Sequence, residues 1–180
     1  LMFEMSKNNQ EIEKLKKEYP QSYIYWLTHN PELLPGSVDD KMQFNLKNIL
    51  ILENINFDIL INLDKDREAC SLAKKIEAKR KFGFILERGI PKPINKLAEH
   101  KYFTGIYNDI SKNNKKSYPT EIFEICGFQF NYEKYSIKKP SNNYNWDINI
   151  NKQVIGLNTG CGNRWKSRVW PEEYWIKLAK

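Results

Sequence analysis

An apolar run followed at once by a helical repeat is the feature that most constrains this fold. Residues Phe57–Leu63 (FDILINL) have the length and branched side chains of a buried strand. In Arg67–Ala78 the apolar residues recur at helical spacing and define one face of a helix (Ala69, Leu72, Ala73 and Ile76). A short strand is predicted next, at Lys81–Ile85. Strand, helix and strand in this order imply an α/β fold with a largely parallel sheet.

The rest of the first 139 residues continues this alternation. A strand is predicted at Ser22–Thr28, and helices are predicted at Asn8–Tyr19, Asn95–Ile106 and Pro119–Cys126. Residues Asn45–Asn54 fit either a helix or a strand. We favour the helix, because two strands joined by a short gap without an Asn-Gly turn would be an unusual hairpin. In a parallel sheet, ligands bind beyond the carboxyl ends of the strands, so the loop residues after Thr28 and Leu63 are candidates.

A change in composition predicts a domain boundary. Lys138–Asn151 is polar, rich in Asn and contains Pro140, as is typical of a linker. A strand at Gln153–Asn158, a loop and a helix from Pro171 are predicted to follow it. We therefore expect one domain over residues 1–139, a linker over 140–151 and the beginning of a second, truncated domain over 152–180.

Composition excludes several classes of protein. With 41% apolar and 28% charged residues among 180, the chain has globular composition, and no apolar run is long enough to span a membrane. No secretory signal is seen, and three well-separated cysteines indicate a reducing, cytoplasmic setting. Only His29 and His100 are present, and both are predicted at the surface, so a metal site is not expected. The net charge of +7 favours anionic partners.

The loop after the predicted strand at Gln153–Asn158 has the properties of a phosphate site. Gly160 and Gly162 allow backbone amides to approach a ligand closely, and a helix is predicted to begin just after the loop. Three cations lie between strand and helix (Arg164, Lys166 and Arg168). The loop matches neither the Walker nor the dinucleotide pattern. A solvated surface loop is the alternative interpretation.

The loop Asp64–Asp66 allows two interpretations. Two carboxylates flanking Lys65 could hold the hydroxyls or phosphates of an acceptor. Alternatively, Asp64 or Asp66 caps the helix that begins at Arg67, which is a common role for an aspartate before a helical repeat. We expect one of the two to be the cap, and we take Lys65 and Asp66 as candidate acceptor-binding residues.

Several segments together resemble glycosyltransferase family 9, the lipopolysaccharide heptosyltransferase family. Members show a K-x-W-P signature entering a helix, which stands here as Arg168-Val169-Trp170-Pro171. The other similar pieces occur in the family's order and are Leu15–Thr28, Phe57–Asp66 and Lys79–Phe84. The resemblance therefore covers most of the chain.

This resemblance implies a GT-B fold, in which two Rossmann-like domains enclose the active site. It implies inverting, metal-independent transfer of a heptose-like sugar from a nucleotide-sugar to an anionic, lipopolysaccharide-type glycolipid at the inner membrane, without a separate cofactor. Arg168 would stabilise the departing diphosphate, and Thr159, Gly160, Gly162 and Lys166 would bind the donor.

The N-terminus departs from the family pattern. Leu1–Lys7 lacks the Gly-Asp pair that follows the family's first strand and that would supply the catalytic base. We accordingly expect that first strand and the base to lie outside this chain.

Two other functions remain open. A non-catalytic phosphate- or nucleotide-binding α/β module would explain the same loop without sugar transfer. A nucleic-acid binder would explain the positive charge, but the chain contains no recognised nucleic-acid motif and its aromatic residues fall in core-like positions.

Overall fold

The structure is a computed structural model and describes residues 2–3, 10–134, 149, 151–160 and 169–179. The chain divides into two compact units, Leu1–Lys139 and Pro140–Lys180. The identification of the second unit as the start of a nucleotide-sugar-binding domain stays a prediction.

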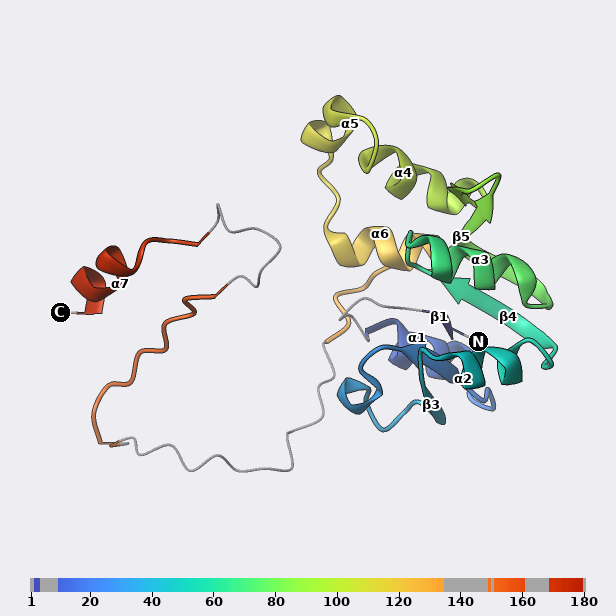
Figure 1. Ribbon diagram of the computed structural model, residues 1–180, viewed down its shortest axis with the longest axis horizontal. Helices are drawn as coiled ribbons and strands as arrows, with labels where there is room; N and C mark the ends of the chain where they lie inside the picture. Colours follow the sequence, from blue (N-terminus) through green and yellow to red (C-terminus); the bar gives the residue numbers. More distant parts are fainter. Residues whose placement is uncertain (1, 4–9, 135–148, 150, 161–168, 180) are drawn as a thin grey trace. The chain divides into compact units, whose positions relative to one another are not determined.

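The first unit is an α/β structure built on a six-stranded sheet (Figure 1). Its strands lie in the order β3-β2-β1-β4-β5-β6, and β1 to β5 are parallel. Their bounds are β1 Met2–Phe3, β2 Tyr25–Thr28, β3 Asp40–Gln43, β4 Phe57–Asn62, β5 Ala78–Glu87 and β6 Ile90–Pro93. The α/β class with a largely parallel sheet is confirmed, and this order is compatible with a Rossmann-like fold.

Helices cover both faces of the sheet because neighbouring residues of a strand point to opposite sides. Trp26 and Ile61 pack with residues of α1 (Gln10–Glu18) and α6 (Tyr118–Ile125). Leu27 and Leu60 pack instead with residues of α2 (Leu46–Leu52) and α3 (Arg67–Lys75). Two hydrophobic cores therefore enclose the central strands.

The outer end of the sheet carries an antiparallel hairpin. β5 continues past β4 and turns into β6 through Arg88 and Gly89, both of which have positive φ (50° and 78°). Positive φ at both central residues defines the tight hairpin turn that matches strand twist. Beyond it come α4 (Lys96–Thr104) and α5 (Asn108–Asn113), and α4 contacts β5, β6, α5 and α6.

The sequence prediction of a missing first strand is wrong. Met2–Phe3 forms β1, which pairs with both β2 and β4 and so lies at the centre of the sheet. Two residues are too short a run to show the alternation by which a strand is recognised.

Further elements differ from expectation. The predicted helix over 67–78 ends at Lys75, and Ala78 already belongs to β5. Residues 153–158 were predicted as a strand, and in the structure they lie in no strand. β3, β6 and α5 were not predicted. β3 and β6 are edge strands with polar or Pro-containing sequences, which weakens their signal.

Candidate functional site

The carboxyl ends of β1 and β4 form the switch point of the sheet. The helix after β1 covers one face and the helix after β4 covers the other, so the chain diverges between these two neighbouring strands. Ligands of open α/β sheets bind in the crevice that such a divergence creates. Residues 4–9, which follow β1, lie outside the described part, so the site is built here from the loop after β4, residues 63–66.

Asn62, the last residue of β4, anchors that loop. Its side chain is fully buried, and its Nδ2 donates a hydrogen bond of 2.7 Å to the backbone oxygen of Phe84 on β5. Its Oδ1 accepts a hydrogen bond of 3.2 Å from the backbone N–H of Asp64. The amide therefore fixes the direction in which the chain leaves the sheet.

Gly83 allows β5 to approach this point. It has a φ of 96°, and a Cβ atom placed on it would lie 1.8 Å from the backbone oxygen of Asn62. A residue with a side chain would clash with β4 and be strained in this conformation. The close pairing of β4 and β5 at Asn62 and Gly83 thus depends on glycine.

Cys70, on α3, completes the support of the loop from below. Its Sγ lies 3.4 Å from the backbone oxygen of Asp64 and 3.6 Å from Nδ2 of Asn62. Burial raises the pKa of the Cys70 thiol to about 11. The thiol is therefore protonated at neutral pH, which suits a structural role rather than that of a nucleophile.

Lys65 lies at the carboxyl edge of the sheet, as predicted, and turns toward the C-terminal end of α4. Its Nζ lies 3.4 Å from the backbone oxygen of Lys101 and 5.7 Å from the centre of the Phe84 ring. Burial, reinforced by the charge of Lys101, lowers the pKa of the Lys65 ammonium. The positive charge is half-buried beside the switch point of the sheet, where an anionic ligand would stabilise it.

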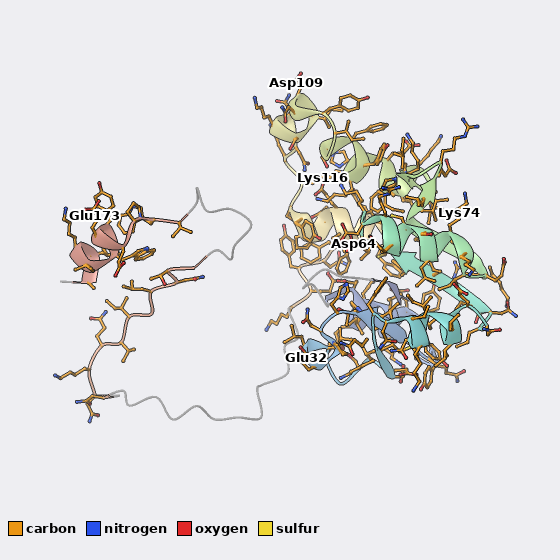
Figure 2. The ribbon with its side chains drawn as sticks, viewed as in Figure 1. Glu32, Asp64, Lys74, Asp109, Lys116 and Glu173 are labelled. Carbon is orange, nitrogen blue, oxygen red and sulfur yellow. The ribbon has the colours of Figure 1, made fainter. Side chains whose placement is uncertain are left out.

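Asp64 and Asp66 share the start of α3 (Figure 2 labels Asp64). Asp66 occupies the N-cap position, but its side chain makes no capping hydrogen bond. Asp64 accepts a 2.9 Å hydrogen bond from the backbone N–H of Asp66 through its Oδ1. The expected cap is thus present by position, while its side-chain bond is not. Asp66 itself is exposed.

A buried carboxylate next to Lys65 holds the elements beyond the sheet together. Glu121, on α6, is 3% exposed, and its Oε2 lies 2.5 Å from Nζ of Lys101 on α4. Its Oε1 accepts a 3.1 Å hydrogen bond from Nδ2 of Asn114 and lies 3.3 Å from Nδ1 of His100. His100 was predicted at the surface; its side chain is 36% exposed, and its Nδ1 lies against this buried carboxylate of α6.

The predicted donor residues lie on the second unit. Thr159 and Gly160 are exposed, and the Gly160 N–H lies 3.4 Å from Oδ1 of Asn158. Gly162, Lys166 and Arg168 lie outside the described residues.

The helix that follows the K-x-W-P-like signature belongs to the described part of the chain. α7 (Glu172–Ala179) begins directly after Pro171, whose backbone oxygen accepts from the Tyr174 N–H at 3.0 Å. Trp170 stacks on the Tyr174 ring at 5.6 Å and meets Trp175 edge-on at 4.9 Å. Trp170 therefore packs against the helix that it precedes.

Sequence reasoning identified the loop but missed the residues beneath it, namely Asn62, Cys70, Gly83 and Glu121. A polar residue ending the apolar run Phe57–Leu63 and a glycine inside the next strand were the available signals. The residues brought together offer carboxylate acceptors, backbone groups and one ammonium, a set that suits a ligand with hydroxyl groups and negative charge.

Within the described ranges, no group of three or more His, Cys, Asp or Glu side chains could hold a metal ion. No helix in that part of the chain is long and apolar enough to cross a membrane. Comparison with protein-family models, curated proteins and solved structures found no match to this chain.

Proposed function

We propose that this chain is part of a glycosyltransferase that moves a heptose-like sugar from a nucleotide-sugar to a lipopolysaccharide-type glycolipid. The observation that carries the proposal is the position of residues 57–84. This segment, which resembles glycosyltransferase family 9, forms β4, the loop, α3 and β5 at the switch point of a parallel sheet. Ligands of such sheets bind at that point.

The proposed reaction is a single displacement with inversion. The acceptor hydroxyl oxygen forms a bond to the anomeric carbon as the bond from that carbon to the diphosphate breaks. A carboxylate base takes the hydroxyl proton, and the negative charge leaves with the nucleoside diphosphate. No metal takes part in this scheme, because cationic side chains neutralise the leaving group.

The first unit would supply the acceptor side. Lys65 is a half-buried ammonium beside the switch point of the sheet, and Asp66 is an exposed residue directly after it. The ammonium would attract a phosphorylated glycolipid, while the carboxylate would accept hydrogen bonds from sugar hydroxyls. Asn62 and Cys70 position both residues without touching the ligand.

The second unit would supply the donor side. In this proposal Arg168 stabilises the departing diphosphate, with help from Lys166 and from the backbone amides of Gly160 and Gly162. Fixed donors aimed at developing charge each contribute roughly 3–4 kcal/mol to a barrier. Arg168 would be the catalytic residue of this chain, and the base would come from elsewhere in the enzyme.

The test is steady-state kinetics on the whole protein with a panel of nucleotide-sugars. Arg168→Ala is expected to lower kcat/KM by a factor that corresponds to a loss of about 2–4 kcal/mol of transition-state stabilisation. The melting temperature should stay unchanged. Lys74→Ala, an exposed lysine on α3, is the matched control and should retain full activity. Arg168→Lys recovers most of the loss only where a point charge suffices.

The same experiment separates the alternative of a non-catalytic nucleotide-binding module. That module would bind nucleotide-sugars by calorimetry without transferring the sugar to any acceptor. Full activity in Arg168→Ala with an unchanged melt would remove the loop from the mechanism and, with it, the main local support for sugar transfer.

A further inference from the structure

A stripe of large apolar side chains lies exposed on the outer end of the first unit. Phe103, Ile106, Tyr107 and Ile110 are 38%, 53%, 53% and 40% exposed. They lie within eight consecutive residues, from the end of α4 through the connection into α5. We call these four residues the α4–α5 stripe.

The stripe runs from the end of α4, through the short connection, into α5. The backbone N–H of Tyr107 donates to the Phe103 oxygen at 2.9 Å and closes α4, whereas Tyr107 itself is extended and its oxygen accepts from the Ser111 N–H at 3.0 Å at the start of α5. The rings of Phe103 and Tyr107 lie 6.0 Å apart. Figure 1 shows α4 and α5 at the end of the unit away from β3. The four exposed side chains therefore lie in one short segment at this end of the unit, with Phe103 and Tyr107 in ring contact.

Positive charge surrounds the stripe. Residues 101–120 contain the lysines Lys101, Lys112, Lys115 and Lys116 and a single aspartate, Asp109. Glu121 and Glu124 on α6 neutralise Lys101 and Lys116. Within the described part of the chain, Lys112 and Lys115 have no ion pair. The ammonium groups of Lys112 and Lys115 thus lie uncompensated next to the apolar residues. Asp109 and Lys116, which belong to the same segment, are labelled in Figure 2.

A hollow adjoins the stripe. An open cavity of about 550 Å³ is lined by Ile110, which belongs to the stripe, and by Asp109, Asn114 and Lys115 among others. Apolar residues beside the unpaired lysines Lys112 and Lys115 match the layered chemistry of a bilayer surface, in which acyl chains lie beneath anionic headgroups.

The stripe also begins beside the candidate site. The backbone oxygen of Lys101, two residues before Phe103, contacts Nζ of Lys65 in the loop after β4. A surface that docked on this stripe would bring membrane lipids to the same edge of the sheet.

We propose that the α4–α5 stripe, together with Lys112 and Lys115, docks this protein on an anionic lipid bilayer. Aromatic and branched side chains would enter the headgroup region, and the lysines would contact lipid phosphates. The choice of a bilayer over a protein partner rests in part on the proposed function, because a glycolipid acceptor lies in such a surface.

The test is co-sedimentation of the 180-residue chain with vesicles of phosphatidylcholine alone or with about one third phosphatidylglycerol. The chain is expected to bind the anionic vesicles and to be released by salt, since surface charges are screened. Ile106→Asn with Ile110→Asn should lower the partition coefficient about tenfold, because both side chains lose their apolar contact with lipid. Lys112→Glu with Lys115→Glu should lower it about tenfold or more.

Matched variants on the opposite region of the unit control for composition. Leu46→Asn with Leu50→Asn removes two exposed leucines of α2, and Lys47→Glu with Lys74→Glu changes the net charge equally. Both controls should bind like the parent chain. All four variants change exposed side chains, and unchanged urea midpoints will show that each is folded.

The proposal is overturned where anionic vesicles do not bind the chain, where the control pairs weaken binding as much as the stripe pairs, or where the stripe mediates self-association without lipid. Donor binding, measured by calorimetry without vesicles, is independent of this result. Vesicle binding without nucleotide-sugar binding would keep the docking surface and reject the transferase, and the reverse outcome would do the opposite.

Discussion

At the scale of single residues, the buried amide of Asn62 does most to shape the candidate site. It joins the end of β4 to β5 through the Phe84 oxygen and to the loop through the Asp64 N–H. A chain of hydrogen bonds continues from Asp64 to the Asp66 N–H. One side chain therefore fixes the backbone of the loop that carries Asp64, Lys65 and Asp66.

Asn62→Ala is expected to destabilise the fold by about 2–4 kcal/mol. It leaves the Phe84 oxygen and the Asp64 N–H without their partner, and each unsatisfied buried group costs roughly 1–3 kcal/mol. Urea unfolding followed by circular dichroism measures the change. The control is Asn54→Ala, whose exposed amide bonds to Leu50 within α2, and its effect should stay within about 0.5 kcal/mol. Equal losses in both variants would contradict the anchoring role of Asn62.

Lys65 shows what residue-level prediction could and could not achieve. Its place at the carboxyl edge follows from counting residues past a recognisable strand. Its contact with α4 could not be predicted, because Lys101 lies 36 residues further on and the path of the chain between them was unknown. The same holds for Glu121, whose burial depends on how α6 packs against α4.

At the scale of elements, burial decided which predictions succeeded. The helix favoured for residues 45–54 is α2, and the run Phe57–Leu63 contains β4, because both present apolar residues to a core. The polar edge strand β3 and the short α5 bury little, and their sequences resemble those of loops. The predicted end of α3 was late because Ile76 keeps the helical spacing while its backbone is already extended.

An ion pair at the entry to β2 and β3 has a testable pH dependence. Asp39 accepts hydrogen bonds from Nζ of Lys16 at 2.5 Å and from the backbone N–H of Ile24 at 2.7 Å. These two contacts, the lysine first, hold the pKa of the Asp39 carboxyl below its usual range. A lowered folded-state pKa contributes stability above the unfolded value, near 4, and that contribution is lost as the pH falls through the folded value.

Asp39→Asn should therefore flatten the dependence of unfolding free energy on pH in the acid range. Urea midpoints of parent and variant, measured from about pH 6 down to about pH 3, should differ most at the upper end and converge at the lower end. Asp109→Asn, an exposed aspartate on α5, is the control and should follow the parent. A gap between parent and Asp39→Asn that widens on acidification would reverse the sign and refute this assignment.

At the scale of the whole molecule, the two units differ in how many hydrophobic side chains they bury. Every buried hydrophobic residue of the described chain lies within residues 1–139, and all but Phe123 belong to the two cores on either side of the sheet. In the described part of the second unit, Val154, Ile155 and Leu178 are 55%, 75% and 60% exposed. In the sequence, the polar, Asn-rich segment Lys138–Asn151 lies between these two parts of the chain.

A fragment of residues 1–139 is accordingly expected to fold alone, with the cooperativity and urea midpoint of the 180-residue chain. It retains both cores and all six strands, so the apolar area buried on folding is unchanged. A peptide of residues 140–180 should show little helix, because α7 has eight residues and isolated helices shorter than about 12–15 residues are marginal in water. Circular dichroism and urea titration of both pieces provide the measurement. A midpoint for the 1–139 fragment well below that of the parent would show that the second unit stabilises the first, and would place part of the folding core beyond Lys139.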